Sequence, residues 1–166
     1  MFTIQLSTQK HGTDRKITRN AVRAIIFENQ QLLMVKTNKG DYKFPGGGIK
    51  EGETREQALV REVLEETGYH VQEVVEKMGT YSISANDRFE HDVLFINHST
   101  YFLCRINAAK IEEQQLETYE ELLGFETVWC TVEEAIHSNL IALKKPYKNE
   151  WVERELTVLT MLMRYL

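Results

Sequence analysis

The stretch that decides the fold is GGGIKEGETREQALVREVLEETGY, which runs from residue 46 to residue 69. Three glycines open it, and Arg61, Glu62, Glu65 and Glu66 crowd its last third. Glycine lets the backbone approach a ligand closely, because no side chain stands in the way. The stretch therefore joins a loop that can contact a ligand to a strongly charged segment, and the purpose of those charges is the first question.

The charged segment has the pattern of a helix. Apolar residues recur at helical spacing and predict a helix over residues 54–67, which Gly68 ends. Neighbours on a helix lie three and four residues apart, so Glu62 lies beside both Glu65 and Glu66. The three carboxylates then project to one side, where like charges repel each other. A bound cation relieves that repulsion, and clustered oxygen ligands suit Mg²⁺ or Mn²⁺; a solvated helix face is the alternative.

The glycine loop strengthens the metal interpretation. Carbonyl oxygens of the FPGGG segment, residues 44–48, can join the carboxylates as ligands. Glu53, at the helix entrance, is placed to pair with Arg61 two turns further on. The alternative is that Glu53 only favours the positive end of the helix dipole, and both can hold together.

Composition limits the partners. The 166 residues suit one domain with one core, so we expect a single domain over residues 1–166. A net charge of -5 argues against nucleic acid or an anionic membrane surface as a partner, because both prefer basic patches. It does not argue against a phosphate-bearing small molecule, since bound divalent cations invert the local charge.

Cysteine usage and targeting signals point to an ordinary intracellular protein. Cys104 and Cys130 lie far apart and outside any CxxC or Cys/His cluster, which predicts two buried reduced thiols rather than a zinc site. The N-terminus lacks the pattern of a signal peptide, and no apolar stretch approaches the ~20 residues of a membrane span. We therefore expect a cytoplasmic protein.

Outside the opening stretch, strands and helices alternate, which predicts a mixed sheet with helices packed against it. We expect strands over residues 20–27, 32–36, 71–75, 78–84, 100–106 and 125–130, and helices over residues 131–138 and 150–165. The first two strands form a hairpin. Segments 85–98 and 107–123 lack a clear pattern; we expect a loop or a weak hairpin over the first and a loop over the second.

The last helix is amphipathic. Its apolar stripe consists of Val152, Leu156, Leu159 and Met163. We expect this stripe to pack on the core of the domain, with a homodimer contact as the alternative.

The segment from Gly47 to Tyr69 resembles the Nudix box, the signature of the Nudix hydrolase family. That box reads Gly, five residues, Glu, seven residues, then Arg-Glu-aliphatic-any-Glu-Glu-any-Gly-aliphatic. The chain supplies seven fixed positions in register, namely Gly47, Glu53, Arg61, Glu62, Glu65, Glu66 and Gly68. Seven fixed positions are far more specific than a lone glycine motif. The departure is Tyr69 in the final aliphatic place, where a large, partly apolar ring should do little harm.

The resemblance implies an α/β/α sandwich around a mixed β-sheet. It implies a hydrolase that cleaves the diphosphate linkage of a nucleoside diphosphate joined to another moiety, with Mg²⁺ or Mn²⁺ as cofactor. The alternative is a Nudix-type module that binds a nucleotide as a sensor, although such modules often lack box carboxylates that this chain retains.

The resemblance also assigns roles to residues by position. Metal ligands would be Glu62, Glu65, Glu66 and the carbonyl of Gly46 or Gly47. Arg61 and Glu53 would form a pair that orients these ligands. The general base varies within the family, and the candidates are Glu62 in the box and three loop carboxylates, Glu117, Glu120 and Glu121. An acidic, solvated loop is the alternative for those three.

Substrate contacts are expected on the first strand and the glycine loop. Arg19 and Arg23 precede or lie within an apolar strand, where an arginine needs a partner. That partner is either a substrate phosphate, which the guanidinium group fits, or a structural ion pair. Tyr42, or else Tyr81, is a candidate to stack on a base. The marks of specialised subfamilies are absent, which leaves a nucleoside triphosphate or a nucleotide sugar as the expected substrate.

Overall fold

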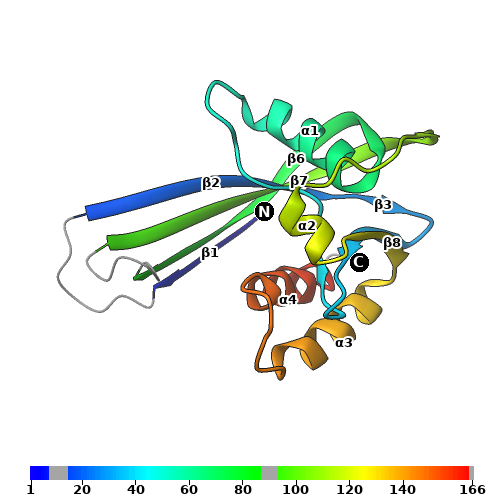
Figure 1. Ribbon diagram of the computed structural model, residues 1–166. Coiled ribbons are helices and arrows are strands. Elements are labelled where there is room, and N and C mark those ends of the chain that lie inside the picture. The colour runs from blue at the N-terminus through cyan, green and yellow to red at the C-terminus, as the bar shows by residue number, and fades with distance from the viewer. Residues whose placement is uncertain (8–14, 87–92, 165–166) are drawn as a thin grey trace.

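The computed structural model describes residues 1–7, 15–86 and 93–164, and its elements form two sheets with helices on both sides (Figure 1). The elements in chain order are β1 (Phe2–Ser7), β2 (Arg15–Ile25), β3 (Phe27–Glu28), β4 (Gln31–Lys36), β5 (Tyr42–Lys43), α1 (Arg55–Thr67), β6 (Tyr69–Asn86), β7 (Val93–Ile111), α2 (Thr118–Leu122), β8 (Glu126–Cys130), α3 (Val132–Leu143) and α4 (Val152–Leu162). One sheet has the order β1-β6-β7-β2 and the other β3-β4-β5, with β8 paired to β4. Pairs β1/β6 and β2/β7 are parallel and the rest are antiparallel, so the arrangement is mixed.

Strand β2 shows how the two faces are separated. Side chains alternate along a strand, so Val22 and Ala24 share one face while Ile25 lies on the other. Val22 and Ala24 pack with the apolar face of α1 in one core cluster. Ile25 packs with residues of α3 and α4 in a second cluster. Figure 1 shows α1 on one side of the strands and α3 and α4 on the other, which confirms the predicted α/β/α layering.

Helix α1 has defined signals at both ends. Thr54 caps its start in a capping box with Gln57, which satisfies two backbone donors. Gly68 ends it with φ of 75°, a conformation that glycine adopts without strain. A side chain at Gly68 would also place its Cβ 2.1 Å from the carbonyl oxygen of Glu112. The helix predicted over residues 54–67 is confirmed.

The last turn of α1 is anchored by a segment from much later in the chain. The backbone N–H of Glu112 donates to the carbonyl of Gly68 at 2.9 Å, and that of Gln115 donates to the carbonyl of Glu65 at 2.8 Å. The side-chain amide of Gln114 donates to the carbonyl of Glu66. Carbonyls at a helix end have no partner within the helix, so this segment satisfies groups that would otherwise need water.

The long strands differ from the sequence expectation. A single strand, β6, replaces the two predicted over 71–75 and 78–84, and β7 begins and ends inside segments 85–98 and 107–123, which lack a clear pattern. Residues 87–92 of the first segment lie outside the described residues. Four register shifts interrupt the β6/β7 pairing. Each such irregularity breaks the period-two pattern, so side-chain alternation could not reveal the full strands.

Several other elements also differ from expectation or extend it. Strand β1, the start of β2 before residue 20 and helix α2 were not expected. Helix α3 continues to Leu143, beyond the predicted end at 138. The predicted hairpin is present, with Asn29 and Gln30 at positive φ in its turn.

Helix α4 packs on the core, as expected, although through a different stripe. Its buried residues are Val152, Glu155, Val158, Leu159 and Leu162. Leu156 is only partly buried and Met163 is 40% exposed, so half of the predicted stripe was wrong. The buried face follows a spacing of three and four residues that includes the acidic Glu155, which an apolar pattern passes over.

Both cysteines are free and buried, as predicted. Among the described residues, no helix is both long and apolar enough to cross a membrane.

Candidate active site

Arg61 holds three carboxylates in one partly buried cluster at α1. Its Nε and one terminal nitrogen bind the two oxygens of Glu53 at 2.6 and 2.8 Å. The other terminal nitrogen donates to Glu62 at 2.7 Å and to Glu65 at 2.9 Å. Because Arg61 stabilises its charged form, the pKa of Glu53 falls to about 2. The expected Glu53–Arg61 contact is therefore present, and it extends to two more box carboxylates.

Glu62 lies directly against the glycine loop. A Cβ at Gly47 would sit 2.2 Å from a carboxylate oxygen of Glu62, so only glycine leaves room for that carboxylate. The loop itself runs along β2, where the N–H of Val22 donates to the carbonyl of Gly47 at 3.0 Å and the N–H of Ala24 to that of Pro45 at 2.8 Å. These bonds fix the glycine backbone beside the carboxylate.

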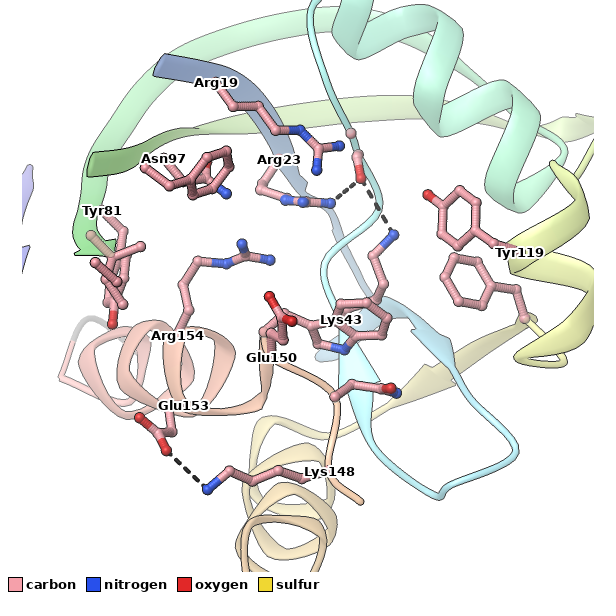
Figure 2. A pocket seen from close by; sticks show the side chains of 18 of the residues that line it. Arg19, Arg23, Lys43, Tyr81, Asn97, Tyr119, Lys148, Glu150, Glu153 and Arg154 are labelled. Atoms are coloured by element: carbon pink, nitrogen blue, oxygen red, sulfur yellow. Dashed lines mark hydrogen bonds and ion pairs between the residues drawn. The ribbon is translucent and has the colours of Figure 1, made fainter. Parts of the chain in front are cut away.

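Glu66, one turn further along α1, belongs to a separate, buried cluster. It forms an ion pair with Lys43, and its second oxygen accepts the N–H of Gly46 at 2.9 Å. Lys43 also donates to the carbonyl of Gly46 at 3.3 Å. A terminal nitrogen of Arg23 donates to the same carbonyl (Figure 2). Burial raises the pKa of Glu66 and lowers that of Lys43, while their mutual attraction opposes both shifts.

The three box glutamates therefore do not meet at one point. Glu62 and Glu65 share Arg61, whereas Glu66 turns to Lys43. Within the part of the chain that the structure describes, no three Asp, Glu, His or Cys side chains lie close enough to share a metal ion. From the sequence we expected the three glutamates to point to one place. In the structure they belong to two clusters, one beside Gly47 and one beside Gly46.

A cavity of about 630 Å³ opens on the other side of those glycines. Its walls come from β2, β6, β7, the segment that contains α2, and the start of α4 (Figure 2). The charged residues that line it are Arg19, Arg23, Lys39, Lys43, Lys148 and Arg154, against Glu117, Glu150 and Glu153. Cations outnumber carboxylates two to one, so the cavity favours an anionic ligand.

Three adjacent strands form one wall of the cavity. Arg19 of β2 lies opposite Asn97 of β7, and Asn97 lies opposite Ile83 of β6. Two residues further along, Tyr81 lies opposite Ser99. Alternate residues of a strand share a face, so this wall combines polar groups near β2 with apolar and aromatic groups near β6.

The cavity receives some of the residues expected to contact substrate. Arg19 and Arg23 line it, and Arg23 is only 7% exposed. Tyr42 is not among the lining residues, and its side chain packs against the core cluster that contains Phe44. Its backbone N–H donates to the side chain of Asn139 at 2.8 Å, and its carbonyl accepts from that side chain at 3.0 Å. Tyr81, the other tyrosine considered for stacking, does line the cavity.

The loop carboxylates have different surroundings. Glu117 lines the cavity. Glu120 is buried, and its oxygens accept the N–H of Glu117 at 2.8 Å and the hydroxyl of Tyr119 at 2.9 Å. Glu121 is exposed and is not a lining residue.

Sequence reasoning missed several charged residues that line the cavity, among them Lys43 and Arg154. Lys43 stands between Tyr42 and Phe44, and a charge inside an aromatic run just before the glycines was an available signal. Arg154 binds Glu155 at 2.5 Å, and Glu155 also accepts the hydroxyl of Tyr101 at 3.1 Å. An acid within the apolar face of a helix needs a partner, which was the signal for Arg154.

Comparison with known proteins agrees with the fold and the box. The chain matches the NUDIX domain family over residues 17–154, so it belongs to that family. It is 42% identical over 65 residues to a putative 8-oxo-dGTP diphosphatase of Bacillus subtilis, covering 39% of this chain and 43% of the relative. It is 36% identical over 80 residues to an ADP-ribose pyrophosphatase of Methanocaldococcus jannaschii, covering 46% of this chain and 47% of the relative. The matches thus span less than half the length of these relatives.

A solved structure shows the same fold over most of the chain. The solution structure of the E. coli ORF135 protein has a TM-score of 0.58 with 22% identity, and the match covers 89% of this chain and 91% of that one. At this identity the likeness shows the fold alone.

Proposed function

We propose that the chain is a metal-dependent pyrophosphohydrolase that cleaves the diphosphate linkage of a nucleoside diphosphate derivative. The observation that carries this proposal is the change of charge across Gly46 and Gly47. Carboxylates gather on one side of the glycines, and a cationic cavity opens on the other. A diphosphate needs both a metal site and positive walls, because its own charge must be neutralised before a nucleophile approaches.

The box carboxylates supply the oxygen donors that a hard divalent cation prefers. Glu62 and Glu65 lie together on Arg61, whereas Glu66 would have to turn away from Lys43 to join them. With that movement the three would hold Mg²⁺ or Mn²⁺, in keeping with the divalent-metal dependence typical of the family.

The carbonyl of Gly46 accepts from the side chains of Arg23 and Lys43, whereas that of Gly47 accepts from the backbone of β2, and either would add an oxygen ligand beside the carboxylates. When bound, the metal would shield the diphosphate and lower the pKa of the attacking water.

The other residues of the site would orient and bind. Arg61 and Glu53 would fix the direction of the carboxylates. Arg19, Arg23 and Lys43 would bind phosphate oxygens from the cavity side, because guanidinium and ammonium groups donate to several oxygens at once.

The proton from water would pass to Glu62 or to a loop carboxylate. Glu120 already accepts two hydrogen bonds in the cap of α2, and Glu121 is exposed outside the cavity. Glu117, whose side chain lines the cavity, is therefore the loop candidate that the geometry favours over those two.

The substrate would be a small nucleotide. One relative is named for a nucleoside triphosphate derivative and the other for ADP-ribose, so both a triphosphate and a nucleotide sugar are within the proposal. An apolar and aromatic part of the cavity, with Tyr81 and Phe95, is suited to a base.

The test is a release assay over nucleoside triphosphates and nucleotide sugars with Mg²⁺ or Mn²⁺, with product masses read out. We expect metal-dependent cleavage within the phosphate chain, lost both in Glu65→Gln and in the Glu65→Gln/Glu66→Gln variant. Circular dichroism checks the fold of the double variant, because Glu66→Gln leaves Lys43 buried without its carboxylate. Glu133→Gln is the matched control, because Glu133 is exposed at the start of α3 and lines neither the cavity nor the surface around Arg61 and Glu65. Nucleotide binding without turnover would instead favour the sensor alternative, and normal turnover in the double variant would reject the metal site.

A further inference from the structure

Several buried polar atoms around the cavity have no partner. Among the described residues, these atoms are Arg23 Nε, Asn97 Oδ1, Ser99 Oγ and Arg154 Nε. Arg23, Asn97 and Arg154 line the cavity, and Ser99 lies on the same face of β7 as Asn97. A buried polar group without a hydrogen bond costs about 1–3 kcal/mol. Their concentration in one place indicates that a polar ligand completes this part of the fold.

Two of these atoms belong to arginines that face each other. Arg23 comes from β2 and Arg154 from α4, and Figure 2 shows both guanidinium groups, with that of Arg19, pointing into the same space. The charge of Arg154 contributes to a lowered pKa of Arg23, so the two groups are close enough to repel. Like charges held together in a buried place need an anion between them.

The nearby carboxylates leave the two Nε atoms without a partner. Three buried acids, Glu66, Glu120 and Glu155, lie around Arg23, Lys43 and Arg154. Glu155 binds Arg154 through one terminal nitrogen, while Arg23 donates to the neutral carbonyl of Gly46. The Nε of each arginine is therefore left to donate to a further acceptor.

We propose that Arg23 and Arg154 form a second anion-binding subsite, which receives a phosphoryl group beyond the phosphates bound at Gly46 and Gly47. This inference rests on the proposed function and narrows its substrate class. A nucleoside triphosphate supplies the additional phosphoryl group, whereas the uncharged sugar of a nucleotide sugar leaves the two guanidinium groups unpaired. Arg154 is thus a specificity-determining residue contributed by the last helix.

The activity test compares the two substrate classes in the Arg154→Gln/Glu155→Gln variant. Both residues are changed because removal of Arg154 alone would leave Glu155 buried without its cation. We expect kcat/KM for nucleoside triphosphates to fall about tenfold or more, mainly through KM, since an Arg–phosphate contact is a strong, charge-assisted one. Turnover of nucleotide sugars should not change.

Two further variants keep this test decisive. Arg154→Lys retains the charge beside Glu155 but loses the planar fork, and a several-fold loss confined to triphosphates is expected even if the double variant does not fold. Arg105→Gln removes an exposed arginine that pairs with Glu73 on the other part of the sheet, and should change neither class. Equal losses for both substrate classes, or no loss in either Arg154 variant, would overturn the subsite.

A binding measurement separates this proposal from the proposed function. Inorganic tripolyphosphate is titrated into the protein by calorimetry in the presence of EDTA, so that no metal or turnover is involved. We expect the wild-type protein and Arg105→Gln to bind it, and the two Arg154 variants to bind it about tenfold more weakly. If the wild-type protein hydrolyses no nucleotide but this difference appears, the proposed function fails and the anion subsite stands. Equal binding by all variants would refute the subsite.

Discussion

Two ion-pair clusters lie on successive turns of α1, and they have opposite composition. Around Arg61, one cation binds three carboxylates at a half-exposed position. Around Glu66, one fully buried carboxylate is bound by Lys43 and lies near Arg23. The first cluster therefore has an excess of negative charge and the second an excess of positive charge. A single helix thus carries an anionic cluster and a cationic cluster on successive turns, both beside the same glycine loop.

Solvent access gives the two clusters different energetic weight. Ion pairs that contact water contribute about 0–1 kcal/mol, whereas removal of one partner from a buried pair costs about 3–5 kcal/mol. Stability should therefore depend mainly on the Lys43 cluster, while the geometry of the metal site should depend mainly on Arg61.

The largest expected effect is that of Lys43→Met. Without metal, Glu66 would be left buried and uncompensated, and the free energy of unfolding should fall by about 3 kcal/mol or more. Urea unfolding in EDTA measures this loss. Lys43→Met/Glu66→Gln removes both charges and should recover most of it. Equal stability of the single and double variants would show that an unpaired Glu66 does not lower the free energy of unfolding by this amount.

Gly47→Ala tests the boundary between the clusters. A Cβ there would meet Glu62 at 2.2 Å, so the carboxylate must move, and a loss of about 1–3 kcal/mol with reduced turnover is expected. Gly52→Ala is the matched control: its φ is 81°, but a Cβ meets nothing within 4 Å. The control should cost about 1 kcal/mol through backbone strain alone and leave turnover intact. Similar turnover in both variants would argue against a role for the Gly47–Glu62 contact.

Arg61→Lys addresses the exposed cluster. Lysine keeps the charge but cannot bind Glu53 with two parallel bonds while also reaching Glu62 and Glu65. We expect stability to change by about 1 kcal/mol or less and kcat/KM to fall about ten- to a hundredfold. Thermal unfolding and steady-state kinetics on the same sample check both. A large loss of stability would mean that this cluster supports the fold rather than the ligands.

The smallest expected effect is the acid response of Glu53. Its pKa is about 2 in the folded chain against an ordinary value of 4.5. A depressed folded pKa gives stability that is present above pH 4.5 and is lost as pH falls through about 2. Denaturation measured from pH 5 to pH 2 should show a shallower decline for Glu53→Gln than for the wild-type chain. An identical decline of stability with falling pH in both proteins would indicate that the Glu53–Arg61 pair does not contribute to stability in solution.

The parts of the fold that follow from local patterns were predicted well. The helix over residues 54–67 has a capping box, apolar spacing and a glycine stop, all of them local. The hairpin likewise follows from two short apolar runs with a polar turn between them, and β8 follows from a short alternating sequence. The full lengths of β6 and β7 were not predicted, because bulges break the alternation of their side chains. Their polar halves are stabilised by pairing with each other, which a local pattern does not reveal.

The residues of the site were likewise predicted where local spacing determines them and missed where long-range packing does. Fixed spacing in the box predicted which residues of α1 and its loop are involved, and the contact of Glu53 with Arg61 follows from helical geometry. The separation of Glu66 from Glu62 did not follow, because Lys43 approaches from β5. Arg154 was missed for the same reason: only the packing of α4 against the sheet brings it to the cavity.

The anchored end of α1 has a consequence for how such a site can diversify. Backbone and side-chain donors of residues 112–115 hold the carbonyls of Glu65, Glu66 and Gly68. The direction of the last helical turn, and with it the aim of two box glutamates, is therefore set partly by a surface segment outside the box. Substitutions in residues 112–115 could therefore change the spacing of the carboxylates while every residue of the box stays the same.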